Sequence, residues 1–274
     1  MRNTNPLVSV IMPAYNAEKY ISEAIKSILN QTFENFKLII IDDCSTDKTW
    51  QIINKYRKID KRVIAFRNNK NLKLSRTLNR GIRVAKGKYI ARMDADDISF
   101  PDRLEKQVKF MEANPEVGVS GGTMVITDAS GRVTGERSYH TTDEKIRKKI
   151  FRYSPFCHPA VIIRKAVLTD SGLYNHYYNP AEDYELYFRI GLQAKFANLK
   201  DKLIKYRVVS DSMTVGGLRA MEFKTIKARK KFYDLYQASI WDRIYTFLLF
   251  ITVVMPIITP NQKLWLFNKI RKFL

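Results

Sequence analysis

Short apolar runs alternate with amphipathic stretches along the first 115 residues of the chain. Four runs have the length and composition of buried strands, and they lie at Leu7–Met12, Leu38–Ile41, Val63–Phe66 and Tyr89–Met93. Between them, apolar side chains recur at helical spacing, as in Ile21, Ala24, Ile25, Ile28 and Leu29 and again in Leu74, Leu78, Ile82 and Ala85. This alternation predicts an α/β fold with a parallel, Rossmann-like sheet.

Turn-forming residues indicate where these elements begin and end. Pro13 is expected to stop the first strand, because proline cannot donate to a sheet ladder. Asn16 is expected to cap the helix that follows, a second helix is expected at about 46–56, and Gly87 is expected to close the third helix.

The pattern changes after about Pro115. Glycines interrupt the apolar runs of 117–137, which predicts a hairpin, and Thr141 and Glu144 have the spacing of a capping box before a basic helix. Further strands are expected at 160–163 and 203–209, and helices from Glu182 onward and over 218–236. A chain of 274 residues with 45% hydrophobic content can form one large core with an appended element, or two small domains.

Two acidic clusters directly follow predicted strands: Asp42-Asp43 after 38–41, and Asp94–Asp97 after 89–93. A carboxylate at the carboxyl end of a strand in an α/β protein points into the crevice where ligands bind. Neighbouring carboxylates repel one another unless a cation or ligand compensates. The arrangement therefore predicts a metal-assisted site for a phosphorylated ligand. A solvated acidic loop at 94–97, and helix N-caps at Asp42 and Asp43, are the structural alternatives.

Composition indicates anionic partners and a reducing environment. The formal charge of +21 attracts nucleic acid, anionic lipid or phosphorylated substrates, although scattered lysines usually form only a solvated surface. Cys44 and Cys157 do not make a disulfide framework, which favours a cytoplasmic protein. The polar start of the chain, residues 1–6, does not have the pattern of a signal peptide.

The last stretch of the chain combines apolar and basic residues. Residues 223–274 contain ten lysines and arginines against two aspartates. The apolar run 245–258 has 14 residues, fewer than the roughly 20 that span a bilayer, and Pro256 and Pro260 interrupt it. Basic and aromatic residues around such a run are typical of a helix that lies in the membrane interface. The alternative is an ordinary helix that docks on the domain or on a partner.

Four motifs, taken together and in this order, resemble those of family 2 glycosyltransferases with the GT-A fold. They are Val8–Asn16, Ile41–Asp47, Asp94–Asp97 with Pro101–Leu104, and Glu182-Asp183. Each motif is weak by itself, but the ordered set at strand ends is specific, and the resemblance covers about residues 8–214. It implies an inverting enzyme of the bacterial surface-polysaccharide type.

The resemblance also implies a domain organisation. Residues 1–215 would form the GT-A catalytic domain, with a nucleotide-sugar half at 1–115 and an acceptor half at 116–215. Residues 216–274 would form a basic, apolar helical tail that associates with a membrane.

On the donor side, the resemblance assigns a role to each matching residue. The first loop of the nucleotide pocket would consist of Pro13, Ala14 and Tyr15. Asp43 would accept a hydrogen bond from the base, and Asp94 would lie near the ribose. Asp96 would hold Mn²⁺ or Mg²⁺ on the diphosphate, because these hard ions prefer oxygen ligands. Asp97 would join this group or cap the next turn.

On the acceptor side, Asp183 is the candidate general base for an in-line displacement with inversion. The dipole of the helix that it opens is expected to keep it ionised. Glu182 is the weaker candidate, and the alternative is that both residues only satisfy the helix N-terminus. His158 matches a motif found near the acceptor in relatives, although a lone histidine is more often structural, and Tyr206-Arg207 resembles the late Tyr-Arg motif of the family.

Two arginines and two departures from the family pattern complete the set. Arg76, a donor-side candidate, and Arg103 could pair with phosphate or with the acidic clusters, although a surface salt bridge is the more usual role of either arginine alone. Many relatives carry a histidine shortly after the late motif, but residues 208–212 hold none, so a third protein ligand for the ion is left open, with Asp211 or water as substitutes. Cys44 stands where relatives commonly carry glycine, which leaves the shape of that loop open.

The sequence therefore predicts a metal-dependent glycosyltransferase that moves a sugar from a nucleotide-diphosphate sugar to a saccharide or lipid-linked acceptor. The basic tail places it at an anionic membrane, on the inner face of the cell membrane, in polysaccharide or glycolipid synthesis. A sugar-phosphate nucleotidyltransferase is an alternative, but the loop at 13–16 lacks the glycine-rich, basic pattern that it would need. A basic, non-enzymatic binding protein for membrane or nucleic acid is another, but strand-end carboxylates would repel a polyanion, and we expect no nucleic-acid partner.

Overall fold

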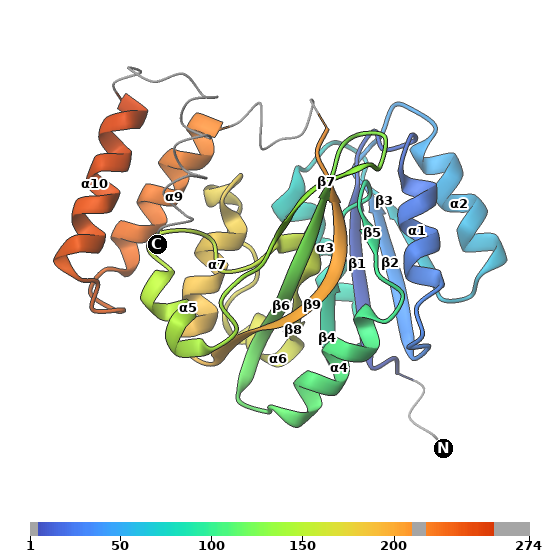
Figure 1. Ribbon diagram of the computed structural model, residues 1–274. Coiled ribbons are helices and arrows are strands. Elements are labelled where there is room, and N and C mark those ends of the chain that lie inside the picture. Colours follow the sequence, from blue (N-terminus) through green and yellow to red (C-terminus); the bar gives the residue numbers. More distant parts are fainter. Residues whose placement is uncertain (1–4, 210–217, 255–274) are drawn as a thin grey trace.

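The computed structural model of the chain describes residues 5–209 and 218–254 (Figure 1). Asp211, the first residues of the chain and the end of the apolar tail lie outside these ranges. Within them, nine strands form one sheet in the order β3-β2-β1-β4-β8-β6-β9-β5, and β7 pairs with β6 beside this path. The strands are β1 (Val8–Ala14), β2 (Phe36–Asp42), β3 (Val63–Arg67), β4 (Tyr89–Arg92), β5 (Ile98–Ser99), β6 (Val117–Thr127), β7 (Val133–Arg137), β8 (Ile162–Arg164) and β9 (Lys195–Arg207).

The sheet is parallel in its first half and mixed in its second. β1, β2, β3 and β4 pair in parallel, as the alternation of strands and helices predicts. β8 then runs antiparallel to β4 and to β6, while β6 and β9 pair in parallel. The predicted hairpin at 117–137 is confirmed, since β7 pairs antiparallel to β6. The carboxyl ends of β1, β2 and β4 therefore meet at one edge, where the acidic clusters follow the strands.

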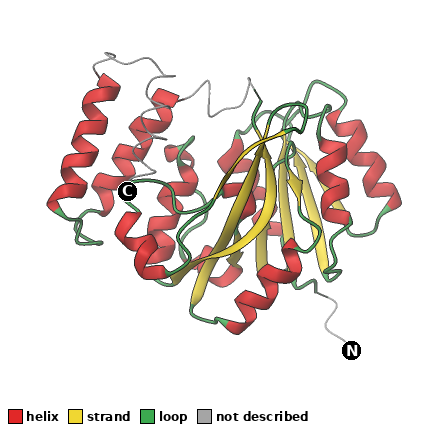
Figure 2. Ribbon diagram, in the orientation of Figure 1, coloured by secondary structure: helices red, strands yellow, loops and turns green. Residues whose placement is uncertain are grey.

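Helices cover both faces of the sheet (Figure 2). They are α1 (Ile21–Leu29), α2 (Thr49–Ile59), α3 (Leu74–Val84), α4 (Arg103–Ala113), α5 (Asp143–Lys149), α6 (Lys165–Asp170), α7 (Glu182–Gly191), α9 (Leu218–Phe232) and α10 (Ile240–Val254). Side chains alternate across β1, so Val10 and Met12 pack in the core with α1, α2 and α4, whereas Ile11 packs in the other core with α3 and α7. This two-sided burial explains why these strands are continuous apolar runs.

Two predicted element ends differ from the structure near the first loop. β1 continues through Pro13 to Ala14, because there it pairs only with β2 and its pairing with β4 has ended at Ile11. Asn16 does not cap a helix, since α1 begins at Ile21. Asn16 instead has a φ of 47° and its side-chain oxygen accepts a hydrogen bond from the Thr46 N–H at 2.9 Å.

Three further predictions, for the end of α3, the start of α5 and the start of β9, differ from the structure. Gly87 does not form a left-handed helix cap, and a Cβ atom there would come within 2.5 Å of the Ser9 nitrogen, so close approach to β1 requires glycine. The capping box is wrong, because Thr142 precedes α5 and Glu144 pairs with Lys148 at 2.6 Å. β9 (Lys195–Arg207) begins eight residues before the predicted start at 203 and ends two residues before the predicted end at 209.

α9 and α10 form a helical pair at the end of the molecule opposite α1 and α2 (Figure 1). α9 packs on α7, where the rings of Phe232 and Phe188 are stacked at 4.9 Å. α10 packs on α9 through Phe250 and Phe223, whose ring centroids lie 6.2 Å apart. In the part of the chain that the structure describes, no helix is long and apolar enough to cross a membrane.

Candidate active site

The loop after β4 gathers three carboxylates. Oxygen atoms of Asp94, Asp96 and Asp97 all lie within 4.8 Å of one another. β4 delivers them to the edge of the sheet, and its last residue, the buried Arg92, forms an ion pair with Asp94. Arg92 was not among the predicted site residues, although a charged residue within an otherwise apolar strand is a usable signal.

Asp97 is the most buried member of this acidic triad, with 1% of its surface exposed. Its Oδ1 accepts a hydrogen bond from the Arg207 N–H at 2.8 Å, 110 residues away in sequence. Its Oδ2 is buried and has no hydrogen-bond partner among the described residues. Asp97 therefore joins the triad rather than capping the next turn.

The crowding of the triad raises the pKa of its carboxyls. Burial and the charge of Asp94 raise the pKa of Asp96 to about 6. The same causes, together with Asp96, raise the pKa of Asp97 well above its ordinary value. Three close carboxylates with a partnerless buried oxygen fit a hard divalent cation, which would offset their repulsion.

Arg207, at the end of β9, connects the triad to α1. Its Nε donates to the Asp96 carbonyl oxygen at 3.0 Å, and its Nη2 pairs with Glu23 Oε2 at 2.5 Å. Its guanidinium also lies over the Tyr20 ring, 4.5 Å from the centroid. The predicted late Tyr-Arg motif thus reaches the acidic loop. Glu23 was missed, because nothing local distinguishes it from other acidic residues in a first helical turn.

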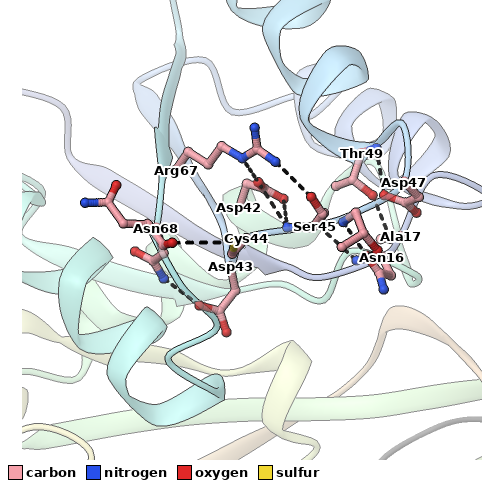
Figure 3. A network of polar contacts seen from close by, with 12 residues as sticks. Asn16, Ala17, Asp42, Asp43, Cys44, Ser45, Asp47, Thr49, Arg67 and Asn68 are labelled. Atoms are coloured by element: carbon pink, nitrogen blue, oxygen red, sulfur yellow. Dashed lines mark hydrogen bonds and ion pairs between the residues drawn. The ribbon is translucent and has the colours of Figure 1, made fainter.

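Asp43, at the end of β2, is held by the loop before α3 (Figure 3). Its Oδ1 accepts hydrogen bonds from Asn68 Nδ2 at 2.6 Å and from the Leu72 N–H at 2.8 Å, and its Oδ2 accepts one from the Lys73 N–H at 2.9 Å. These donors fix the carboxylate. Because each carboxylate oxygen can accept two hydrogen bonds, Oδ2 retains acceptor capacity for a ligand.

Asp42 has a structural role beside it. It pairs with Arg67 at 2.9 Å and its oxygens lie 3.4 Å from the Ser45 nitrogen (Figure 3). The N-cap alternative is wrong for both Asp42 and Asp43, since α2 begins at Thr49 and Asp47 accepts the Thr49 N–H at 2.9 Å.

The first loop is tied to the loop after β2 (Figure 3). The N–H groups of Asn16 and Ala17 donate to Ser45 Oγ at 3.0 Å and Thr49 Oγ1 at 2.7 Å. Pro13 and Ala14 are buried at the end of β1, whereas Tyr15 is half exposed. Cys44 has a φ of 64°, the left-handed conformation that glycine adopts at little cost, so cysteine keeps the loop in a glycine-like shape.

Glu182 and Asp183 open α7, and Asp183 lies close to a histidine that is hydrogen-bonded to a tyrosine. Asp183 Oδ2 lies 4.0 Å from His158 Nδ1, and His158 Nε2 is hydrogen-bonded to the Tyr174 hydroxyl at 2.9 Å. Burial and nearby Arg92 lower the pKa of His158 well below its ordinary value, so this imidazole is neutral. Tyr174 was missed by the sequence analysis.

Burial outweighs the helix dipole at Asp183. Backbone N–H groups of the first turn lower its pKa, but burial raises that pKa more, so the net shift is upward. The backbone of the first turn thus favours the ionised form of Asp183, as expected, and burial, which the sequence does not reveal, opposes it. Glu182 is 2% exposed, its Oε2 has no partner among the described residues, and burial with the charge of Asp183 raises its pKa to about 8.

Glu182 should make stability depend on pH. Its folded-state pKa of about 8 exceeds the ordinary value, so its contribution to stability is present at low pH and is lost as pH rises to about 8. The interval runs from the ordinary pKa of 4.5 to about pH 8. Across it, we expect the free energy of unfolding of Glu182→Gln, which cannot ionise, to rise relative to that of the wild type by at most about 1.4 kcal/mol per pH unit. Thermal unfolding of both proteins at several pH values tests this, and a difference in Tm that does not change with pH contradicts it.

The two candidate arginines lie in different surroundings. Arg76 is exposed on α3 and makes no hydrogen bond or ion pair with either acidic cluster among the described residues. Arg103 is fully buried, donates from Nη2 to the Arg92 carbonyl oxygen at 2.7 Å and from Nε to Gln107 at 3.0 Å. The surface salt bridge is thus wrong for Arg103, which supports the strand that carries the triad.

The family assignment follows from comparison with known proteins. A family model described as "Glycosyl transferase family 2" matches residues 9–172, which include both acidic clusters. The chain belongs to glycosyl transferase family 2. The mixed α/β sheet and its flanking helices are the GT-A architecture that the resemblance implied.

Relatives agree with this assignment. The family 2 chain is 38% identical over 213 residues to an uncharacterized glycosyltransferase of Haemophilus influenzae, across 74% of this chain and 66% of the relative. It is 30% identical to the amylovoran biosynthesis glycosyltransferase AmsE of Erwinia amylovora over 92% of this chain and 95% of AmsE. The family 2 chain is therefore a glycosyltransferase, as predicted.

Solved structures show the same fold at low identity. S. aureus TarS residues 1–349, in complex with UDP-GlcNAc, superimposes with a TM-score of 0.64 at 21% identity, over 90% of this chain and 81% of that one. The mannosyltransferase PcManGT from Pyrobaculum calidifontis, in complex with GDP-Man and Mn²⁺, has a TM-score of 0.66 at 16% identity, over 98% of this chain and 81% of that one.

Proposed function

We propose that this glycosyltransferase transfers a sugar from a nucleotide-diphosphate sugar to a hydroxyl group, with inversion at the anomeric carbon. The observation that carries the proposal is the acidic triad at the carboxyl end of β4, with Asp43 at the end of β2 on the same edge. The nucleotide sugars in the TarS and PcManGT complexes support this class of donor. The assignment of AmsE to amylovoran biosynthesis supports a role in polysaccharide synthesis.

The donor would bind along this edge. The Oδ2 atom of Asp43, which accepts one hydrogen bond from Lys73, can accept a second and would do so from the base. Pro13, Ala14 and Tyr15, at the end of β1, would line the nucleotide pocket. Asp94, which is ion-paired to Arg92, would contact the ribose. Arg76, exposed on α3, would pair with a donor phosphate; it is the weakest member of the set, because no hydrogen bond or ion pair holds its side chain among the described residues.

Asp96 and Asp97, with Asp94, would hold a divalent cation. Their oxygens lie close enough together to share one ion, and Mn²⁺ and Mg²⁺ both suit carboxylate ligands. Such an ion, when bound, neutralises charge that develops on the leaving diphosphate. Arg207, at the end of β9, positions the Asp96 backbone and the Asp97 carboxylate by donating a hydrogen bond to each.

Asp183 would act as the general base. The acceptor oxygen attacks the anomeric carbon, the bond from that carbon to the diphosphate oxygen breaks, and the hydroxyl proton passes to Asp183. Burial raises the pKa of this carboxyl toward the range in which proton transfer is efficient. Neutral His158, whose Nδ1 lies 4.0 Å from Asp183 Oδ2, does not hold this carboxylate in a strong ion pair.

A product assay tests the proposal against its rival. We expect the purified protein to release a nucleoside diphosphate from a UDP- or GDP-sugar when saccharide or lipid-linked acceptors are supplied. Release of pyrophosphate from a nucleoside triphosphate and a sugar phosphate would instead identify a nucleotidyltransferase. Salt-sensitive nucleic-acid binding with no turnover of any nucleotide sugar would favour the non-enzymatic alternative.

The surface of α10 supports a location on the inner face of the cell membrane. Several large apolar side chains of this helix are exposed, namely Ile240, Trp241, Ile244, Phe247, Leu248 and Val254. α9, which packs against α10, carries several lysines and arginines, and the ammonium group of Lys230 lies over the Phe250 ring of α10, 5.4 Å from its centroid. An apolar helix face beside basic residues suits an interface with anionic lipid, where a lipid-linked acceptor would be available.

Membrane binding should depend on the apolar side chains of α10. We expect the triple variant Trp241→Ser, Phe247→Ser and Leu248→Ser to bind anionic vesicles at least about tenfold more weakly, because the wild-type side chains, 68%, 60% and 53% exposed, would enter the lipid. Vesicle sedimentation measures the change. Val133→Ser, at an equally exposed site on β7, is the control. Full-length protein that never sediments with anionic vesicles contradicts the membrane location.

A further inference from the structure

The hydrogen bonds of Asp43 leave its carboxylate with one free acceptor position (Figure 3). Each oxygen of an ionised carboxylate can accept two hydrogen bonds. Oδ1 already accepts from Asn68 Nδ2 at 2.6 Å and from the Leu72 N–H at 2.8 Å, so it is saturated. Oδ2 accepts only from the Lys73 N–H, at 2.9 Å, among the described residues. A ligand can therefore place one N–H donor on this side chain, and that donor would bind Oδ2.

Asn68 cannot turn its amide away from Oδ1 of Asp43. Asn68 is buried, and both ends of its amide are engaged. Its Nδ2 also donates to the Thr77 hydroxyl at 3.1 Å, and its Oδ1 accepts from Arg80 Nη1. Because a guanidinium has only donors, a flipped amide would set donor against donor at Arg80 and acceptor against acceptor at Asp43. The buried network therefore keeps Oδ1 saturated whether or not a ligand is bound.

The other oxygen, Oδ2, has the weaker hold of protein donors. Its one donor is shared, because the Lys73 N–H also donates to Asn71 Oδ1 at 3.1 Å. Lys73 has a φ of 66°, a conformation that glycine adopts more readily, and this turn brings its N–H onto the carboxylate. Asp43 as a whole is only 4% exposed, so little of it can be reached by a ligand. Oδ2 is the atom with acceptor capacity to offer.

Nucleobases differ in the number of N–H donors that they present to a carboxylate. Uracil presents one, the imide N3–H, whereas guanine presents two side by side, N1–H and an N–H of its 2-amino group. Guanine thus needs a free acceptor position on both oxygens, and Oδ1 of Asp43 has none left. The second donor of guanine would be buried without a partner, which weakens binding about tenfold or more.

We propose that Asp43, saturated on one oxygen by Asn68 and Leu72, selects a base with a single imide N–H, so that the enzyme uses a UDP-sugar in preference to a GDP-sugar; this rests on the proposed transferase function. Asn68 is then a positioning residue, because it acts on the choice of base through Asp43 without touching the base. TarS was solved with UDP-GlcNAc and PcManGT with GDP-Man, so the shared fold does not itself decide between these donors.

Binding of nucleoside diphosphates to the full-length protein tests this selection. Calorimetry in the presence of Mn²⁺ compares UDP, GDP and inosine diphosphate, whose base keeps the N1–H of guanine but lacks the 2-amino group. We expect UDP and inosine diphosphate each to bind about tenfold more tightly than GDP. GDP that binds as tightly as UDP overturns the proposal. Inosine diphosphate that binds no more tightly than GDP also overturns it, because the size of the purine would then decide.

Asn68→Ala tests the positioning role. Loss of the amide frees an acceptor position on Oδ1, so the ratio of the Kd for GDP to the Kd for UDP should fall about tenfold. Asn69→Ala, the same change at the next and exposed residue, is the matched control and should keep the wild-type ratio. A folded Asn68→Ala protein with an unchanged ratio overturns the proposal. The comparison of inosine diphosphate with GDP uses the wild type and does not depend on the folding of this variant.

The same measurements separate this inference from the proposed function. If none of the nucleoside diphosphates binds in the presence of Mn²⁺, the proposed nucleotide-sugar transferase is refuted together with the choice of base. If GDP binds and is preferred over UDP, only the role of Asp43 and Asn68 in selecting the base is refuted, and the transferase function stands.

Discussion

Replacing Asp183 with asparagine is expected to lower the rate of sugar transfer by about 10²–10⁴-fold, the usual contribution of a positioned general base. Asparagine keeps the size of the side chain and its place in the first turn of α7, but its amide cannot accept the acceptor proton. The buried surroundings of Asp183 raise its pKa, so the wild-type carboxylate is a better base than an exposed aspartate. The effect should fall on kcat, with the KM for the nucleotide sugar nearly unchanged.

The neighbouring residue provides a matched control. Glu182→Gln makes the same chemical change one position earlier in the same helical turn, at a side chain that is 2% exposed. We expect this variant to keep most of the wild-type rate. If Glu182→Gln is inactive while Asp183→Asn is active, the roles of the two carboxyls are exchanged. If both remain active, neither residue is the base.

Removing the divalent cation, or replacing Asp96 with asparagine, is expected to reduce transfer on the order of a thousandfold, since a bound ion contributes several kcal/mol to such transition states. Stability gives a second readout. Without cation, Asp96→Asn should be at least as stable as the wild type, because one of three crowded charges is gone. Added Mn²⁺ should raise the Tm of the wild type but not of the variant.

Asp102→Asn is the control for this prediction. Asp102 is acidic, lies a few residues after the triad and forms a surface ion pair with Lys106 at 2.8 Å. Its loss should change neither the cation dependence of the rate nor the Tm response to Mn²⁺. A variant at Asp96 that keeps full cation-dependent activity would remove this residue from the proposed metal site.

Much of the fold and the donor edge of the site could be predicted from sequence, for a physical reason. Strands buried on both faces must be continuous apolar runs, so β1, β2 and β4 were recognisable. The carboxyl ends of parallel neighbours share one edge, which brings Asp43 and Asp94 to the same side of the sheet. These conclusions need only local pattern and the rules of parallel pairing.

The rest of the site depends on contacts between distant segments. The ion pair of Arg207 with Glu23 joins residues 184 positions apart, and the hydrogen bond of Asp97 to Arg207 spans 110. The buried position of Arg103 likewise follows from its contacts with Arg92 and Gln107, which only the folded chain creates. No local pattern separates such residues from solvated surface charges, so the sequence suggested a surface role for Arg103.

The packing of α9 on α7 matters for anyone who shortens the chain to obtain a detergent-free protein. Phe232 stacks on Phe188, Arg229 donates to the Tyr184 hydroxyl at 3.1 Å, and the Tyr236 hydroxyl donates to the Phe188 carbonyl oxygen at 2.7 Å. Truncation before α9 would remove these partners from α7, the helix that carries Asp183 in its first turn, and a loss of turnover would then reflect damage to the catalytic domain. A stop codon placed after Ala238 retains these three contacts and discards α10.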